Sequence, residues 1–79
     1  MIVLALLCTP AFGQTTAIDW LNKGNALVDL GRYNESILSY DRAIELNPQY
    51  ANAWNNKGNA LVNLGRYNES ILSYDRPLS

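Results

Sequence analysis

The chain has 79 residues, with 6 Lys+Arg, 7 Asp+Glu and no His, and its formal net charge is −1. A chain of this size forms one small domain at most, and it lacks the basic surface that non-specific binding of nucleic acid requires. With no His and a single Cys, zinc sites, Cys–His dyads and Ser–His–Asp triads are excluded within one chain. We therefore predict no catalytic residue, cofactor or metal site, and a binding or scaffold module is favoured over an enzyme.

The first 16 residues differ in character from the rest of the chain. Residues 2–7 form a continuous apolar run, and no charged residue occurs before Asp19. A short apolar run followed by small residues is typical of a secretory leader, with cleavage expected after Gly13. The run lacks the Lys or Arg that usually precedes it, so an apolar segment packed on the domain is the alternative. The leader predicts an extracytoplasmic or secreted protein, and its absence would predict a cytoplasmic one.

A stable membrane span is not predicted, because a transmembrane helix needs about 20 apolar residues.

Beyond the leader, the chain repeats itself. Residues 20–42 (WLNKGNALVDLGRYNESILSYDR) and 54–76 (WNNKGNALVNLGRYNESILSYDR) agree at 21 of 23 positions, at an offset of 34. A fixed period of this length indicates stacked structural repeats. The chain is therefore divided into a leader (1–16), a first repeat (17–50) and a shorter second repeat (51–79).

Apolar residues at helical spacing predict two helices in each repeat, four in all. In the first helix, Trp20, Leu27 and Leu30 share one face, and Gly31 is the expected C-terminal stop. Asn34 is the expected N-cap of the second helix, which ends at Asn47-Pro48. The expected helices span residues 18–30, 34–46, 52–64 and 68–76.

One glycine stands inside the first helix of each repeat, where Gly costs about 1 kcal/mol relative to Ala. Gly24 and Gly58 therefore predict a close approach of the second helix, with Ser36 and Ser70 as the opposing small residues. Aromatic residues at this spacing are expected to fill gaps between helices rather than to form a stacking platform for a ligand. These aromatic residues are Trp20, Trp54, Tyr33 and Tyr67.

Together these features resemble the tetratricopeptide repeat, a helix–turn–helix unit of 34 residues. The matching residues are Trp20 and Trp54, Gly24 and Gly58, the Gly-Arg-Tyr loops at 31–33 and 65–67, Tyr40 and Tyr74, Ala43 and Pro48. The resemblance implies an all-α fold of antiparallel helix–turn–helix repeats, an α-solenoid fragment that binds proteins or peptides and has no catalytic activity. Lys23 and Lys57 depart from the family, which usually has Leu there, and their amines are expected to reach water.

In this family the first helices of successive repeats line a concave groove. By position, that face comprises Ile18, Leu21, Asn22, Asn25, Val28 and Asp29, followed by Asn52, Asn55, Asn56, Asn59, Val62 and Asn63. Asn side chains offer both donors and acceptors to an extended peptide. The candidate partner-binding residues are Asn22, Asn25, Asp29, Asn55, Asn56, Asn59 and Asn63. The alternative is that these are ordinary solvated helix faces, and a clamp for a C-terminal carboxylate is not expected because the face has no Lys or Arg.

The second repeat is short of a full unit, and Pro77 is expected to end its last helix near Arg76. About 1.7 repeats are present where three or more are normally needed for stability. The faces around Leu61, Leu64, Ile71 and Tyr74 are expected to lack cover. We therefore predict weak stability, self-association into a homo-oligomer through these uncapped ends, or an origin as a fragment of a longer array.

Several weaker signals remain. Asn34 and Asn68 begin N-x-S sequons and are candidate glycosylation sites in a secreted chain, although an inward-facing Ser36 would hinder modification. Asp41 and Glu45 lie four residues apart on one helix, but an exposed acidic face is favoured over a catalytic pair. Binding of single-stranded RNA is a less favoured alternative, because the groove is uncharged apart from Asp29.

Overall fold

The computed structural model describes residues 15–75, which are all-α with no strand. The predicted fold class and the four helices are confirmed, and each boundary lies within one residue of its predicted position. The helices are α2 (Ala17–Asp29), α3 (Tyr33–Leu46), α4 (Ala51–Asn63) and α5 (Tyr67–Asp75). Most of the predicted leader (residues 1–14) lies outside the described residues, as does Pro77.

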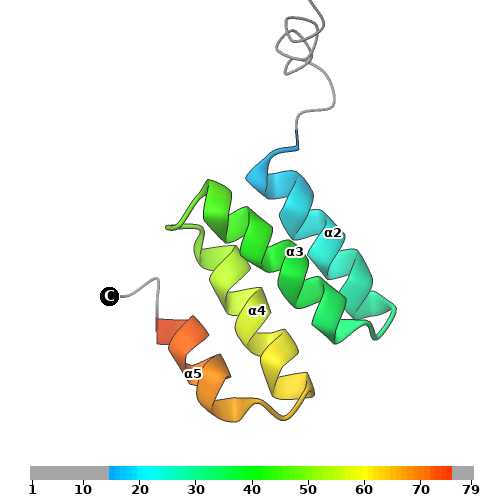
Figure 1. Cartoon of the computed structure of the whole chain (residues 1–79), viewed down its shortest axis with the longest axis vertical. Coiled ribbons are helices and arrows are strands. Elements are labelled where there is room, and N and C mark those ends of the chain that lie inside the picture. Colours follow the sequence, from blue (N-terminus) through cyan, green and yellow to red (C-terminus); the bar gives the residue numbers. More distant parts are fainter. Residues whose placement is uncertain (1–14, 76–79) are drawn as a thin grey trace, which may run out of the picture.

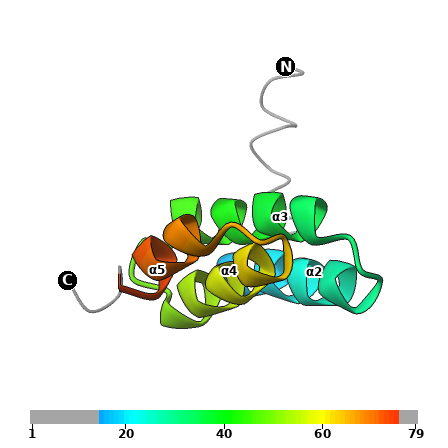
Figure 2. The same cartoon turned by 90° about the horizontal axis from the view of Figure 1, so that it is seen from below.

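The helices form two antiparallel hairpins, α2/α3 and α4/α5, which pack together through α3 and α4. They follow one another across the molecule in chain order, so α2 and α5 lie at opposite sides of the array (Figure 1). In the perpendicular view, α2 and α4 occupy one layer while α3 and α5 occupy the other (Figure 2). Each inner helix is therefore packed on both sides, whereas α5 packs on α4 alone and α2 packs on α3 with a smaller contact to α4.

The ends of the helices follow from local sequence. Gly31 and Gly65 have φ values of 76° and 78°, the left-handed conformation that ends a helix most easily at glycine. At the start of α2, the hydroxyl of Thr16 accepts a hydrogen bond from the Asp19 backbone N–H (3.2 Å), and the Asp19 carboxylate accepts one from the Thr16 N–H (3.0 Å). This reciprocal capping box was not predicted, although its Thr-x-x-Asp spacing is visible in the sequence.

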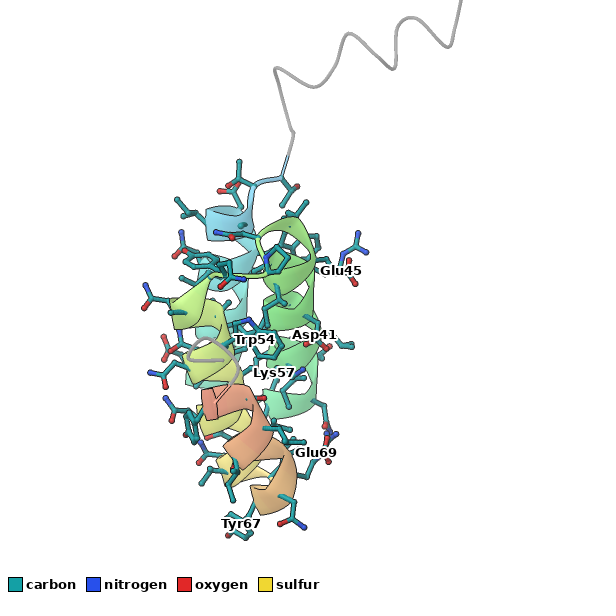
Figure 3. All side chains as sticks on the ribbon, turned by 90° about the vertical axis from the view of Figure 1, so that its left-hand side faces the viewer. Asp41, Glu45, Trp54, Lys57, Tyr67 and Glu69 are labelled. Carbon is teal, nitrogen blue, oxygen red and sulfur yellow. The ribbon has the colours of Figure 1, made fainter. Side chains whose placement is uncertain are left out.

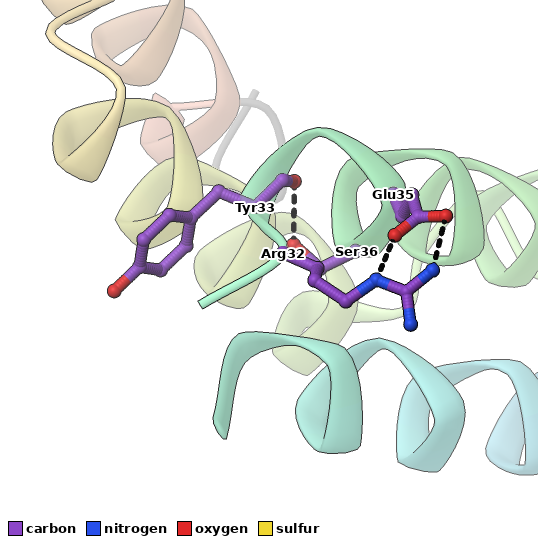
Figure 4. A network of polar contacts seen from close by, with 4 residues as sticks. All are labelled: Arg32, Tyr33, Glu35 and Ser36. Carbon is purple, nitrogen blue, oxygen red and sulfur yellow. Dashed lines mark hydrogen bonds and ion pairs between the residues drawn. The ribbon is translucent and has the colours of Figure 1, made fainter. Parts of the chain in front are cut away.

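The prediction that Asn34 caps α3 is wrong, because α3 begins at Tyr33 and Asn34 lies inside its first turn. The turn is held instead by Arg32, whose guanidinium donates to both carboxylate oxygens of Glu35, with Nη2 at 2.8 Å from Oε2 (Figure 4). The hydroxyl of Ser36 donates to the Tyr33 carbonyl at 2.7 Å. The hydrogen bond from Arg32 lowers the pKa of Glu35, which keeps a negative charge at the helix N-terminus where it is favourable.

The second hairpin repeats this turn at an offset of 34 residues. Arg66 donates to Glu69 at 2.6 and 2.9 Å, and the hydroxyl of Ser70 donates to the Tyr67 carbonyl at 2.6 Å. Identical sequence has therefore produced identical local structure in both copies. Differences between the copies must come from what packs against each of them.

Both interior glycines do receive a close neighbour, but Ser36 and Ser70 are not the opposing residues. A Cβ added to Gly58 would lie 2.6 Å from the ring of Tyr74, and one added to Gly24 would overlap the ring of Tyr40. Ser36 is buried and uses its hydroxyl within its own helix. The glycines thus make room for an aromatic ring.

The core runs through both hairpins and is centred on α3 and α4. Its buried apolar residues are Leu21, Ile37, Tyr40, Ala43, Ala53, Ala60 and Leu61. Trp20 and Tyr33 pack at its edge, as predicted, and the indole N–H of Trp54 donates to the Pro48 carbonyl at 2.8 Å.

Four residues lie elsewhere than predicted. Leu21 belongs to the core rather than to the groove face. Leu61 is buried rather than uncovered, because α4 is flanked by both α3 and α5. Leu30 stands at the C-cap of α2 and is exposed, and Tyr67 is exposed at the start of α5. Neither of these two side chains has a second hairpin beside it.

Candidate functional site

An open polar hollow of about 210 Å³ lies along the layer formed by α2 and α4. It is lined by Asn25, Val28, Asp29, Tyr40, Asn56, Asn59, Ala60 and Asn63. Five of the seven candidate residues therefore come together in one place. The other two, Asn22 and Asn55, are exposed on the same helices but do not line the hollow.

Asn25 is the centre of the hydrogen bonding in this hollow. Its side-chain oxygen accepts from the Tyr40 hydroxyl at 2.6 Å and from the Asn56 amide Nδ2 at 3.0 Å. The three residues belong to α2, α3 and α4, so the bonds connect the first hairpin to the second. Both acceptor positions of the Asn25 oxygen are occupied, and its own amide N–H groups have no partner among residues 15–75.

The second hairpin reproduces half of this arrangement. The Tyr74 hydroxyl donates to the side-chain oxygen of Asn59, as the Tyr40 hydroxyl does to Asn25. The Asn63 amide Nδ2 donates to the Asn59 backbone carbonyl at 2.9 Å. Within the described part of the chain, the hollow thus offers amide donors from Asn25 and Asn59.

Tyr40 is held as a hydrogen-bond donor by its surroundings. Burial raises the pKa of its hydroxyl, and the negative charge of Asp29 raises the pKa further. The hydroxyl therefore stays protonated at neutral pH and keeps its bond to Asn25. Among residues 15–75, Asp29 is the one charged residue that lines the hollow.

The lysines lie away from this hollow. Lys57 pairs with Asp41 of α3 at 2.7 Å and lies over the ring of Trp54 at 5.6 Å (Figure 3). The Lys57 side chain keeps 22% of its surface exposed, and its ion pair connects α4 to α3. Lys23 lies over the ring of Trp20 at 5.2 Å. No cation in residues 15–75 lines the hollow, so it offers no charged clamp for a carboxylate.

Comparison with known families shows to which family the chain belongs. A family model described as TPR repeat matches residues 24–65, which is more than half of the chain. The chain belongs to the tetratricopeptide repeat (TPR) family. The predicted membership is thus confirmed, whereas no curated protein matches the sequence. TPR domains generally serve as scaffolds for protein–protein contact and are typically non-catalytic.

The first helices of the two TPR hairpins do line a common hollow, but one of its polar groups was missed. Tyr40 was identified only as the aromatic residue of the TPR second helix, yet its hydroxyl reaches across to Asn25. A signal for this role exists in the sequence, since both copies have Tyr rather than Phe at this position. A buried Tyr needs a partner for its hydroxyl, and the groove Asn residues supply one.

The sequons lie on the second helix of each TPR hairpin. Asn34 and Asn68 are exposed in the first turns of α3 and α5, whereas Ser36 and Ser70 are buried. Glycosylation at these sites stays a prediction. Within residues 15–75 there is no cluster of metal-ligating side chains, and no helix there is long and apolar enough to cross a membrane.

Proposed function

We propose that this TPR chain is a non-catalytic scaffold module that holds an extended peptide segment of a protein partner in its Asn-rich groove. The groove is formed by Asn25, Asp29, Asn56, Asn59 and Asn63. The observation that carries the proposal is the double use of the Asn25 side-chain oxygen, which accepts from Tyr40 at 2.6 Å and from Asn56 at 3.0 Å. These bonds orient the Asn25 amide and leave its N–H groups for a ligand.

The polar groups of the groove match an extended backbone better than they match a charged ligand. Asn25 and Asn59 supply N–H donors, because their side-chain oxygens are already bonded. Asn56 and Asn63 use their amide nitrogens within the protein and so present oxygen acceptors. An extended peptide alternates carbonyl acceptors with N–H donors and can pair with both kinds of group.

Asp29 adds the charge preference of the proposed ligand. As the one charged side chain that the described part of the chain contributes to the groove, it favours peptides with a nearby Lys or Arg over acidic peptides. Single-stranded RNA is disfavoured for the same reason, because its phosphates would meet a carboxylate and no cation.

The experiment is selection from a random library of linear displayed peptides, followed by NMR titration of the ¹⁵N-labelled chain with the enriched peptides. We expect the side-chain amide signals of Asn25 and Asn59 to shift, while those of Asn34 and Asn68 on the second helices stay unchanged. Asn63→Ala should weaken binding, and Asn34→Ala is the matched control. Shifts confined to other surfaces, equal losses in the two variants, or tighter binding of an RNA homopolymer would each overturn the proposal.

A further inference from the structure

The 9 residues of α5 are identical in sequence to the first nine residues of α3, yet α5 exposes apolar residues that α3 buries. Ile37 on α3 is 7% exposed, whereas its equivalent on α5, Ile71, is 55% exposed. Tyr33 is half-buried, and its equivalent Tyr67 is exposed. Because the two segments are identical in sequence and local fold, the difference reflects the cover that α4 provides to α3. Tyr67 and Ile71 form what we call the α5 face.

Helix α2 shows the complementary difference when compared with α4. Ala60 and Leu61 of α4 are each 1% exposed where α4 packs between α3 and α5. Their equivalents Ala26 and Leu27 are exposed and half-buried, respectively. Leu64 packs against the core, whereas its equivalent Leu30 is 68% exposed. Ala26, Leu27 and Leu30 form what we call the α2 face.

We propose that a second copy of this chain docks its α2 face on the α5 face of the first, in the way that α4 docks on α3 within one chain. The internal α3–α4 interface is the template, and the residues of both faces are identical in sequence to those that meet there. Helices α2 and α5, which carry these faces, lie at opposite sides of the array (Figure 1), so docking leaves one of each face free. Contact of this head-to-tail kind adds further copies instead of closing a dimer.

Among the positions at which α2 differs from α4, one replaces a fully buried residue of the template by a charged one. Ala53 of α4 is fully buried, and its equivalent in α2 is the exposed Asp19, whose carboxylate caps its own helix. A carboxylate placed where the template has a buried alanine must lose water, and this is costly. Docking between copies is therefore weaker than the internal interface. Neither face includes a residue that lines the groove.

The chain offers a matched control for each face. Leu72 directly follows Ile71 and is 65% exposed, and its equivalent Leu38 is also 65% exposed although α4 covers α3. Position 72 thus lies outside the surface that the next helix covers. On α2, Ile18 serves the same purpose, because it is exposed and its α4 equivalent Asn52 is exposed as well.

The test is sedimentation velocity of the full 79-residue chain over a wide concentration range. Wild type should form species larger than a dimer as concentration rises. Ile71→Glu and Leu30→Glu should each remain monomeric, whereas Leu72→Glu and Ile18→Glu should associate like wild type. An equimolar mixture of Ile71→Glu and Leu30→Glu should form a two-chain complex and nothing larger, because only one pair of intact faces remains.

Circular dichroism of each variant establishes that it has folded, which is expected because the substituted side chains are exposed. A wild-type chain that stays monomeric at all concentrations would overturn the proposal. So would a mixture that shows no complex, or control variants as disruptive as the face variants. These outcomes are independent of peptide binding, since association can fail while the groove still binds its ligand.

Substitution at position 19 gives a second readout of opposite sign. Asp19→Ala reproduces the residue of the internal template, and Asp19→Asn removes only the charge. Both should tighten association, by about tenfold for Asp19→Ala if desolvation of the carboxylate costs about 1.4 kcal/mol. Unchanged or weaker association in both folded variants would show that α2 does not occupy the α5 face.

Discussion

At the scale of single residues, the groove depends on a tyrosine hydroxyl that the second helix directs toward the first. Tyr40 is almost fully buried, and its bond to Asn25 satisfies a polar group that would otherwise be costly in the core. The same bond orients the Asn25 amide that we assign to ligand binding. Stability and binding therefore share one hydrogen bond.

We expect Tyr40→Phe to lower the free energy of unfolding by about 1 kcal/mol at pH 7, the usual net contribution of such a bond. The variant should also change how the free energy of unfolding depends on pH in the alkaline range. Burial raises the pKa of Tyr40 above its ordinary value of 10.0, so this group stabilises the fold below pH 10 and loses that contribution as pH rises through the raised pKa. Urea unfolding from pH 7 upward measures both effects.

Tyr67→Phe is the control for this experiment, because the Tyr67 ring is exposed. Its unfolding free energy should follow that of wild type at every pH. The explanation fails if wild type and Tyr40→Phe lose stability in parallel above pH 10.

At the scale of helices, local sequence signals predicted the helix boundaries well, but they predicted the contacts between helices poorly. Helix ends follow from glycine turns and from Asn47-Pro48, which act within a few residues. The residue facing Gly24 depends on how two helices are placed against each other, and helical spacing does not specify this. Spacing therefore suggested Ser36 where the structure has Tyr40. Five groove residues were predicted because the family places its groove on the first helices. The Tyr40 hydroxyl was not predicted, because it comes from the second helix.

The two interior glycines give a prediction at this scale. Alanine in a helix interior gains about 1 kcal/mol over glycine, whereas a forced overlap in a packed core costs about 1–3 kcal/mol. The Tyr40 ring is buried in the core and its hydroxyl is bonded to Asn25, so the ring cannot easily shift and Gly24→Ala should be destabilising. The Tyr74 hydroxyl is bonded to Asn59 in the same way, but its ring is only half-buried and can shift with less disturbance of the core, so Gly58→Ala should be closer to neutral.

Thermal or urea unfolding of the two glycine variants tests this difference. Asn22→Ala, at an exposed site of α2, reports the effect of alanine on the helix without any overlap. Equal losses at Gly24 and Gly58 would contradict the argument that the mobility of the facing ring decides the cost.

At the scale of the whole molecule, stability follows the number of neighbours that each helix has. The hairpins are nearly identical in sequence, so their differences come from their place in the array. In repeat proteins, stability is approximately the sum of the contributions of each repeat and of the interfaces between neighbours. Helices α3 and α4 are packed on both sides, whereas α5 packs only on α4, and α2 packs on α3 and touches α4 along one edge. The outer helices should therefore open first.

Hydrogen exchange can measure this difference in opening free energy between outer and inner helices. Residues 34 positions apart serve as an internal standard, because they have the same local sequence. The backbone amides of Leu38 in α3 and Leu72 in α5 have identical neighbours and so the same intrinsic exchange rate. In dilute solution we expect Leu72 to exchange at least about tenfold faster, a difference of about 1.4 kcal/mol in opening free energy. Equal rates would show that both hairpins open as one unit. If copies dock head to tail, raising the concentration should slow exchange at Leu72 in wild type and leave it unchanged in Ile71→Glu.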